Sequence, residues 1–402
     1  MVLVFAVYYR WAGLDLRPFG VDIDVYTRGA RAVLAGEDLY TVQIHGLLFT
    51  YSPFAAVAFV PLLAFSTEVG HLVLTALSAV AYLFVVATVA RRLALPRATA
   101  ALVAVGGLAA EPFLRGMLLG QVNLLLVAMV VTDLLVLRAS RRGFLIGVAA
   151  GVKLVPGIFV LYFVLQRDWK SLGRSAIGLG ASVAIGAAFA PQATWKYWTG
   201  GFVTMNKFGE ASVFAADNQS LSAFLMRLLH AADLPLVVTA VGCLAGLTLG
   251  VGAAWIQLRR RDEVAAVVCL AVGGLLASPV SWSHHWVWVV VVILVLVHRR
   301  QLVSAWLVGI LFWIGPFWML PVGSFRELGL SAAQQVVGGC YVLAGVLILA
   351  QLCRPGRPSA SPQVSSPLQV SGPLQEVDPE PAMNGLPARS REREPAVSPS
   401  AG

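Results

Sequence analysis

The feature that most constrains this chain is a set of long uncharged runs. Residues 235–258 (PLVVTAVGCLAGLTLGVGAAWIQL) and residues 302–325 carry no charge, and residues 69–90 carry none apart from His71. Each run is longer than the ~18 apolar residues that a helix needs to span the hydrocarbon core of a bilayer. Strands of a membrane barrel would alternate in polarity over about ten residues, and these runs do not alternate. The sequence therefore predicts an all-α polytopic membrane protein.

The basic residues predict how the chain is threaded through the membrane. The net charge is +9, and the basic side chains fall in short clusters between apolar runs, at residues 91–92, 141–142, 167–174, 259–261 and 299–300. Such clusters are typical of cytoplasmic loops, so the charge does not require a nucleic-acid partner. Counting the runs against this rule predicts about 10–12 transmembrane helices. In this layout residues 53–66 form a re-entrant or interfacial helix, and residues 143–166 form two half-spans with Lys153 near the turn.

Composition divides the chain into two parts. Residues 1–353 form the predicted membrane domain, although residues 1–12 are too short to span a bilayer alone and favour a start upstream. Residues 354–402 are rich in Pro and Ser and almost lack large apolar residues. This composition predicts a disordered tail on the cytoplasmic side. The cytoplasmic loops are short and basic, whereas polar residues gather on the outer side, so we expect an active site on the extracytoplasmic face.

The first candidate motif is VDIDVYTRGARAVLAGEDLY, residues 21–40. Its spacing predicts a helix that stops near Gly36. Asp24 lies four residues before Arg28 and could pair with it on one helix face. Asp22 has no such partner in the sequence. It is either a helix cap or, if partly desolvated at the membrane boundary, a general base with a raised pKa.

Four further motifs carry polar side chains next to apolar runs. In EPFLRGMLLGQVN, Arg115 is a lone cation that could bind an anionic group or a lipid headgroup, while Gln121 and Asn123 could cap a loop or bind substrate. In GVKLVPG, Lys153 is costly inside a membrane unless it is functional or paired, and Asp133 is a possible partner. The polar residues of DNQSLS, residues 217–222, are a weak signal alone.

The motif SPVSWSHHW, residues 278–286, places His284 and His285 at an outer membrane boundary. Its tryptophans have an ordinary role as interfacial anchors. The histidines lack a third ligand at zinc-like spacing, so no metal site is expected here. Hydrogen bonding to an anionic group fits them better.

Together these motifs provide a candidate base, several cations and many amide and hydroxyl donors beside lipid. That set suits the displacement of a lipid-linked phosphate by an acceptor hydroxyl, because the leaving phosphate needs cationic or hydrogen-bond stabilisation and the hydroxyl needs a base. Long apolar helices could hold a polyprenyl chain. Two alternatives stay open: a glycolipid transporter or flippase, which predicts charges buried mid-span and internal symmetry, and a lipid-linked glycan ligase.

Several motifs, in this order, also resemble a known family: VDIDVY, RAVLAGEDLY, FTYSPFAAV (49–57), GQVNLLLV (120–127), GVKLVPGIF (151–159), NQSL (218–221) and SPVSWSHHW. The sequence resembles glycosyltransferase family 87 over about residues 15–353. These are mannosyltransferases of the GT-C fold from actinobacteria and relatives. The resemblance implies a polyprenyl-phosphate-mannose donor and α-(1→2) bonds in phosphatidylinositol mannosides, lipomannan and lipoarabinomannan.

The resemblance also assigns roles to residues. The family pattern places an aspartate four residues before a tyrosine, as Asp22 stands before Tyr26, which favours Asp22 over Asp24 as the base. It implies that His284 or His285 contacts the donor phosphate, and the remaining candidates divide between the two substrates. We expect Arg115 and Lys153 at the donor phosphate, and Tyr26, Gln121, Asn123, Asn218 and Gln219 at the substrates. No resident cofactor is expected, and a requirement for a divalent metal is left open.

Overall fold

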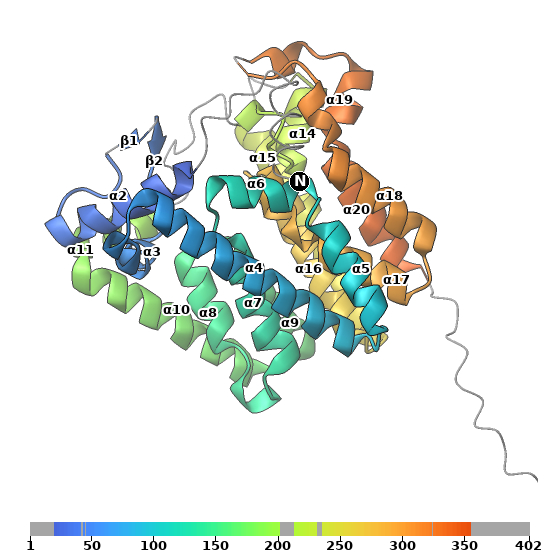
Figure 1. Ribbon diagram of the computed structural model, residues 1–402, viewed down its shortest axis with the longest axis horizontal. Helices are drawn as coiled ribbons and strands as arrows, with labels where there is room; N and C mark the ends of the chain where they lie inside the picture. The colour runs from blue at the N-terminus through green and yellow to red at the C-terminus, as the bar shows by residue number, and fades with distance from the viewer. Residues whose placement is uncertain are drawn as a thin grey trace, which may run out of the picture. The chain divides into compact units, whose positions relative to one another are not determined.

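The computed structural model describes residues 20–41, 43–44, 46–201, 213–230, 235–323 and 325–354 (Figure 1). The chain divides into two units, residues 1–357 and 358–402, and the description that follows concerns the first unit. The predicted tail, apart from Arg354, lies outside the described residues, as do residues 1–12.

Helices make up almost all of the regular structure. The α-helices are α2 (Val21–Ala35), α3 (Pro53–Ala58), α4 (Thr67–Arg92), α5 (Arg97–Gly107), α6 (Glu111–Leu119), α7 (Asn123–Val131), α8 (Phe144–Val152), α9 (Val160–Gln166), α10 (Trp169–Phe189), α11 (Pro191–Lys196), α14 (Leu221–Leu228), α15 (Pro235–Arg259), α16 (Glu263–Ala277), α17 (Val289–His298), α18 (Leu302–Ile314), α19 (Ala332–Gly338) and α20 (Cys340–Cys353). Short 3-10 or π segments are η1 (Val60–Ala64), η2 (Thr132–Val136), η3 (Ala139–Arg141), η4 (Val155–Phe159), η5 (Tyr197–Gly201), η6 (Ser283–Trp288), η7 (Pro316–Met319) and η8 (Arg326–Gly329). One small hairpin pairs β1 (Gln43–Ile44) with β2 (Leu47–Leu48).

Several helices are long and apolar enough to cross a membrane. Among the described residues these are α4, α10, α15 and the stretch Leu302–Met319, and two bent pairs, α5 with α6 and α19 with α20, pass the same test together. Five shorter apolar helices accompany them. The prediction of an all-α, multi-pass membrane protein is therefore confirmed, while the finer number of ten to twelve spans stays a prediction.

Small residues let neighbouring helices approach each other closely. A side chain at Gly250 of α15 would place its Cβ 2.5 Å from the Cα of Gly273 on α16, and one at Gly147 of α8 would meet the backbone carbonyl of Ser175 on α10. Close backbone approach through small residues is the usual packing of membrane helices, because lipid provides no hydrophobic force between them. These two contacts fix α8 and α16, whose ends carry site residues.

The stretch 143–166 is broken as the sequence predicts, with Lys153 at the turn. α8 ends at Val152, Lys153 is extended (φ −143°), and η4 and α9 follow. The possible pairing of Lys153 with Asp133 is wrong. Asp133 instead accepts hydrogen bonds from the backbone N–H groups of Gly143 (2.5 Å) and Ile146 (3.1 Å), at the start of α8. The nine residues of α8 are about 14 Å long and separate the two charges.

The basic clusters predicted to be cytoplasmic come together at one end of the helices. Arg92 at the end of α4 donates to the carbonyl of Leu135, and Arg299 after α17 pairs with Asp262 at 2.8 Å. Further links join Arg174 to the carbonyls of Ala139 and Arg142, and Arg260 to the carbonyls of Leu352 and Arg354. The N-terminal ends of α4, α7 and α17 therefore lie at the opposite end of the unit, and the candidate site lies there too.

Candidate active site

Asp22 lies in the first turn of α2. Gly20, which has no side chain, occupies the N-cap in a left-handed conformation (φ 70°), so Asp22 is not the N-cap residue and that alternative is wrong. The N–H of Gly20 bonds the carbonyl of Leu118 in α6 (2.9 Å), which fixes the start of α2 against that helix. α2 ends at Gly36 (φ 68°), as predicted. A carboxylate in a first helical turn is favoured by the helix dipole.

The surroundings of Asp22 tune it for accepting a proton near neutral pH. Burial raises the pKa of Asp22 to about 6, against the opposing effects of a hydrogen bond from Gln121 and the charges of Lys153 and Arg115. The side chain is half-buried, so part of it is accessible. A base whose pKa lies just below the working pH is largely ionised and yet takes up a proton well.

Two tyrosines orient the amide of Gln121. The hydroxyls of Tyr26 and Tyr51 donate to Gln121 Oε1 over 3.3 and 3.4 Å and lie 3.0 Å from each other. Tyr26 is stacked on Phe59 with ring centroids 4.2 Å apart. Because Oε1 is used by the tyrosines, the NH₂ group of Gln121 is left to donate to Asp22. The structure thus brings predicted Tyr26 and Gln121 together with Asp22, and adds Tyr51.

The second aspartate of the motif faces a different set of groups. Asp24 Oδ1 accepts a hydrogen bond from the Thr67 hydroxyl at the start of α4 (3.2 Å). Arg28, its expected partner, forms an ion pair with Glu37 at 2.5 Å. The hydrogen bond to Thr67 gives Asp24 a structural contact between α2 and α4.

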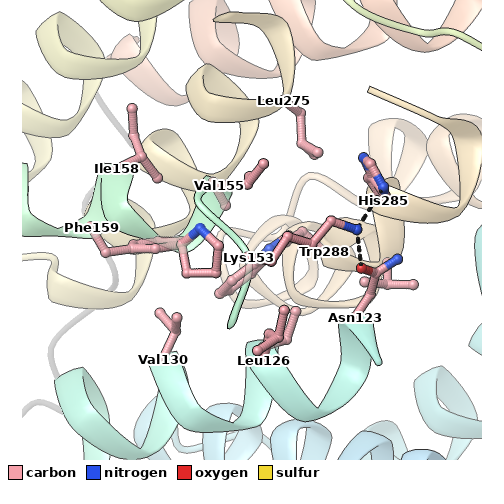
Figure 2. A pocket seen from close by; sticks show the side chains of 14 residues that line it. Asn123, Leu126, Val130, Lys153, Val155, Ile158, Phe159, Leu275, His285 and Trp288 are labelled. Atoms are coloured by element: carbon pink, nitrogen blue, oxygen red, sulfur yellow. Dashed lines mark hydrogen bonds between the residues drawn. The ribbon is translucent and has the colours of Figure 1, made fainter. Parts of the chain in front are cut away.

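Lys153 is the centre of a polar cluster at the ends of α7, α8 and η6. Its ammonium group donates to Asn123 Oδ1 (2.9 Å) and lies 3.0 Å from His285 Nε2 (Figure 2). Because an ammonium group only donates, Nε2 accepts and the ring proton of His285 is on Nδ1. Asn123 Nδ2 in turn donates to the carbonyl of His284 (3.1 Å). Four predicted residues from three motifs, counting His284, thus meet in one cluster.

The two histidines differ in their environment. Their rings are perpendicular, with centroids 4.7 Å apart. His285 is engaged by Lys153, whereas His284 is 6% exposed and neither of its ring nitrogens bonds any residue that the structure describes. A buried imidazole with both nitrogens available is costly unless a ligand occupies them, which singles out His284 as the better candidate for a substrate contact.

An apolar pocket opens beside Lys153 and His285. It encloses about 490 Å³ of space, open solvent included. Figure 2 shows Lys153, His285 and Asn123 at one side of the pocket and apolar side chains around the rest. Those apolar residues come from four helical elements and include Leu126, Val130, Ile158, Phe159, Leu275 and Trp288. A pocket with an ammonium group and hydrogen-bonding side chains at one side and an apolar wall suits an amphipathic anion such as a lipid phosphate.

Arg115 projects from α6 into the same region. It pairs with Asp217 at 3.5 Å, and its guanidinium lies 4.8 Å from the ring centroid of Trp318. Burial raises the pKa of Asp217, and Arg115 opposes that shift. Arg227 donates to the carbonyls of Ala215 and Asn218, on either side of Asp217, which anchors the loop.

Asn218 and Gln219 follow Asp217 and are fully buried. Asn218 Oδ1 accepts from the N–H of Ser281 (3.0 Å), and Gln219 Nε2 donates to the carbonyl of Gly338 (2.7 Å). These bonds join the DNQS loop to the histidine segment and to α19. The geometry gives both side chains a part in holding the loop, and their contact with substrate stays a prediction.

Glu111, at the start of α6, was not among the predicted site residues. Its carboxylate accepts hydrogen bonds from the hydroxyl of Ser283 (2.7 Å), the indole N–H of Trp318 (3.0 Å) and the hydroxyl of Tyr341 (3.1 Å). Ser283 precedes His284, so Glu111 joins α6 to the histidine segment. No local pattern reveals this, because the three partners lie 172 to 230 residues away in the chain.

Comparison with known proteins gives the same family as these motifs. The model of glycosyltransferase family 87 matches residues 49–279. The chain belongs to glycosyltransferase family 87. A protein of Mycolicibacterium smegmatis named polyprenol-phosphate-mannose-dependent alpha-(1-2)-phosphatidylinositol mannoside mannosyltransferase is 34% identical over 85% of each chain. Its namesake in Mycobacterium tuberculosis is 31% identical over 83% of this chain and 84% of its own.

A third relative of this family 87 member carries a different name. The polyprenol-phosphate-mannose-dependent alpha-(1-2)-phosphatidylinositol pentamannoside mannosyltransferase of Mycolicibacterium smegmatis is 32% identical over 74% of this chain and 75% of its own. The two kinds of relative are about equally similar to the chain, so identity alone does not separate their acceptors. No solved structure matches it.

The described residues of this family 87 protein supply several groups that can take part in a reaction. Among these residues no three His, Cys, Asp or Glu residues are grouped so that they could hold a metal ion. The groups that can do chemistry are one carboxylate, Asp22, and the cations Lys153 and Arg115 with the imidazole of His284. This set can deprotonate a hydroxyl on one side and stabilise a phosphate on the other.

Proposed function

We propose that this family 87 glycosyltransferase transfers mannose from polyprenyl-phosphate-mannose to a mannosyl hydroxyl of a phosphatidylinositol mannoside or related lipoglycan, forming an α-(1→2) bond. The names of the relatives support this donor, acceptor class and linkage. The observation that carries the proposal is that Asp22 lies close enough to Lys153 for the lysine charge to lower its pKa, while Lys153 borders an apolar pocket.

In this proposal Asp22 is the general base. It takes the proton from the acceptor hydroxyl as the hydroxyl oxygen bonds to C1 of the donor mannose. The bond between C1 and the phosphate oxygen breaks, and its electron pair leaves with the polyprenyl phosphate. A single displacement inverts the anomeric centre, so a β-linked donor gives an α-linked product. Substrate positioning and charge stabilisation supply the rest of the catalysis, and the proposal includes no resident cofactor.

The phosphate of the donor is placed at Lys153, His284 and Arg115. Lys153 and Arg115 supply positive charge, and His284 has two ring nitrogens that no described residue occupies. Charge on the leaving phosphate grows in the transition state, so cations fixed in advance stabilise the transition state more than the bound donor. The polyprenyl chain then follows the apolar wall of the pocket, past Phe159 and Trp288.

We further propose that the site faces the extracytoplasmic side of the cytoplasmic membrane and that the C-terminal tail is cytoplasmic. The support is the separation of the two ends of the helices. The basic clusters meet at one end, and Asp22, Lys153 and the histidines lie at the other. Basic residues are retained on the cytoplasmic side of bacterial membrane proteins. A lipid-linked donor fits this sidedness, because it needs no nucleotide sugar outside the cell.

The test of the transfer is an assay with the full chain in lipid nanodiscs. Labelled polyprenyl-phosphate-mannose is mixed with phosphatidylinositol mannosides that differ in mannose number, and the product is digested with an α-(1→2)-specific mannosidase. We expect label to move to at least one acceptor and to be released by the enzyme. A parallel reaction with a metal chelator tests whether the transfer requires a divalent metal. Transfer from a nucleotide sugar alone, or a product resistant to the mannosidase, contradicts the proposal.

The sidedness has its own experiment. In a background without the four native cysteines, Asp38→Cys and Arg326→Cys at exposed positions near the site should react with an impermeant maleimide in intact cells. Arg141→Cys and Arg300→Cys, exposed at the basic end, should react only after lysis. If the first two cysteines react only after lysis and the last two react in intact cells, the site faces the cytoplasm.

A further inference from the structure

Tyr51 touches both halves of the site. It lies between β2 and α3 and is 7% exposed. Its hydroxyl lies 3.0 Å from that of Tyr26 and donates to Gln121 Oε1, on the side of Asp22. The face of its ring lies 5.4 Å from the Nζ atom of Lys153, measured to the ring centroid, on the side of the donor phosphate.

The backbone around Tyr51 is fixed by its neighbours. The hydroxyl of Ser52 donates to the carbonyl of Gly151, in the last turn of α8 and two residues before Lys153. It also accepts from the N–H of Ala55, which caps α3. The hydroxyl of Tyr40 donates to the carbonyl of Tyr51 (3.2 Å). The backbone of Tyr51 is therefore held in place independently of the contacts that its side chain makes with Gln121 and Lys153.

We propose that Tyr51 is a positioning residue with two separable functions: its hydroxyl orients Gln121 towards Asp22, and its ring holds the Lys153 ammonium at the donor phosphate. This inference rests on the proposed function, because it assigns Asp22 and Lys153 their roles in that reaction.

The hydroxyl acts through the asymmetry of the amide. A glutamine side chain has one acceptor oxygen and one donor NH₂. With the hydroxyls of Tyr26 and Tyr51 donating to Oε1, the NH₂ group is directed at Asp22. Without the Tyr51 hydroxyl, one of the two hydrogen bonds that fix the Gln121 amide is lost. If the amide then rotates by 180°, its oxygen points at the Asp22 carboxylate. The base then loses a hydrogen bond that favours its ionised form.

The charged and titratable groups around Asp22 come from several elements that pack near the start of α2. Lys153 follows α8, Arg115 lies on α6, and the hydroxyls of Tyr26 and Tyr51 lie on α2 and before α3. α4, which packs on α2, carries His71, whose Nε2 is 2.7 Å from the carbonyl oxygen of Met117. Substituting the Tyr51 hydroxyl alone removes none of these charges.

The ring acts on Lys153 through cation–π attraction. A lysine ammonium near the face of an aromatic ring is attracted by the negative charge on that face, and more strongly when the pair is shielded from water. Phenylalanine preserves this attraction and leucine removes it. The pair Tyr51→Phe and Tyr51→Leu therefore separates the hydroxyl from the ring.

The experiment measures two quantities for each variant in nanodiscs: the pH profile of kcat/KM, and the affinity for polyprenyl phosphate without sugar. Tyr51→Phe should move the acid limb of the pH profile to higher pH and reduce kcat about tenfold. Its affinity for polyprenyl phosphate should stay within about twofold of the wild-type value. Tyr51→Leu should show the same limb and bind polyprenyl phosphate roughly tenfold more weakly. Tyr82→Phe, which removes a buried tyrosine hydroxyl bonded to the Ala104 carbonyl outside the site, is the matched control and should change neither quantity.

A double-mutant cycle tests whether the Tyr51 hydroxyl acts on Asp22 through Gln121. Because the hydroxyl acts through Gln121, Tyr51→Phe in a Gln121→Ala background should move the acid limb no further. The function of the hydroxyl is contradicted if the acid limb does not move in Tyr51→Phe, or if its shift adds to that of Gln121→Ala. The function of the ring is contradicted if the phenylalanine and leucine variants bind polyprenyl phosphate equally well. If the wild-type protein binds polyprenyl phosphate but transfers no mannose, the proposed function fails, and the affinities of the two variants still decide the function of the ring.

Discussion

Two carboxylates near the site, Asp22 and Glu111, have similar positions and different environments. Each lies in the first turn of a helix. Glu111 is 1% exposed and its oxygens accept bonds from a serine, a tryptophan and a tyrosine. Asp22 is half-buried; burial raises its pKa, and a hydrogen bond from Gln121 opposes that rise. Burial at a helix start is thus common to both regions, and the number of fixed donors distinguishes them.

This difference is the reason that we propose Asp22 as the base and Glu111 as a structural anchor. An ionised carboxylate offers about four lone-pair positions. In Glu111 three of them are used by donors that join α6 to the histidine segment, to η7 and to α20. A group used in this way holds its neighbours in place and has little capacity for a substrate proton. Asp22 keeps its accessible part free for an acceptor hydroxyl.

The strongest test of this comparison replaces each carboxylate by its amide. Asp22→Asn should lower kcat/KM about 10³-fold, because the amide keeps the shape but cannot take a proton. Glu111→Gln keeps an acceptor oxygen for the surrounding donors and should lower kcat/KM by no more than about tenfold, with some loss of stability. Both variants are assayed in nanodiscs after folding is checked by gel filtration. Equal losses in the two variants would remove the distinction between base and anchor.

The next largest loss of kcat/KM is expected from substitution of the two histidines near the proposed donor phosphate. His284→Ala should reduce kcat/KM about 100-fold, because it removes a buried group that we place at the leaving phosphate. His285→Ala should cost about tenfold, since Lys153 keeps its bond to Asn123 and its charge. The measurement is initial rate over a range of donor concentrations. A larger loss in His285→Ala would exchange the roles of the two rings.

The smallest effect is expected at the second aspartate of α2. Asp24→Asn retains an oxygen that can accept from the Thr67 hydroxyl, so kcat/KM should stay within about twofold of the wild type. A loss comparable with that of Asp22→Asn would move the base to Asp24. Thr67→Val serves as the control for loss of the contact between α2 and α4 alone.

Local sequence patterns predicted the framework because they depend on local physics. The long apolar runs, the helix stop at Gly36 and the break at Lys153 each follow from the residues at that place. The membrane-spanning class of the fold is readable in the same way. The exact number of spans is not, since the short helices α7, α8 and α9 are too short to be counted by length.

Partners distant in sequence could not be predicted. Glu111 reads as one of several outer polar residues until Ser283, Trp318 and Tyr341 converge on it. Tyr51 reads as an aromatic in a loop, and only the fold brings Gln121 and Lys153 to its two sides. The possible pairing of Lys153 with Asp133 is wrong for the same reason. Both residues lie beside apolar runs in the sequence, but in the fold Asp133 lies at the start of α8 and Lys153 at its end.

The most direct test of the central claim is the pH profile of kcat/KM for mannosyl transfer, which reports the ionisation of the free enzyme. A general base works only when ionised, and burial raises the pKa of Asp22 to about 6. We predict that kcat/KM falls tenfold per pH unit below about pH 6 and is level just above it, and that this limb is absent from the residual activity of Asp22→Asn. A limb near pH 4, or one that persists unchanged in Asp22→Asn, would contradict the assignment of Asp22 as the base.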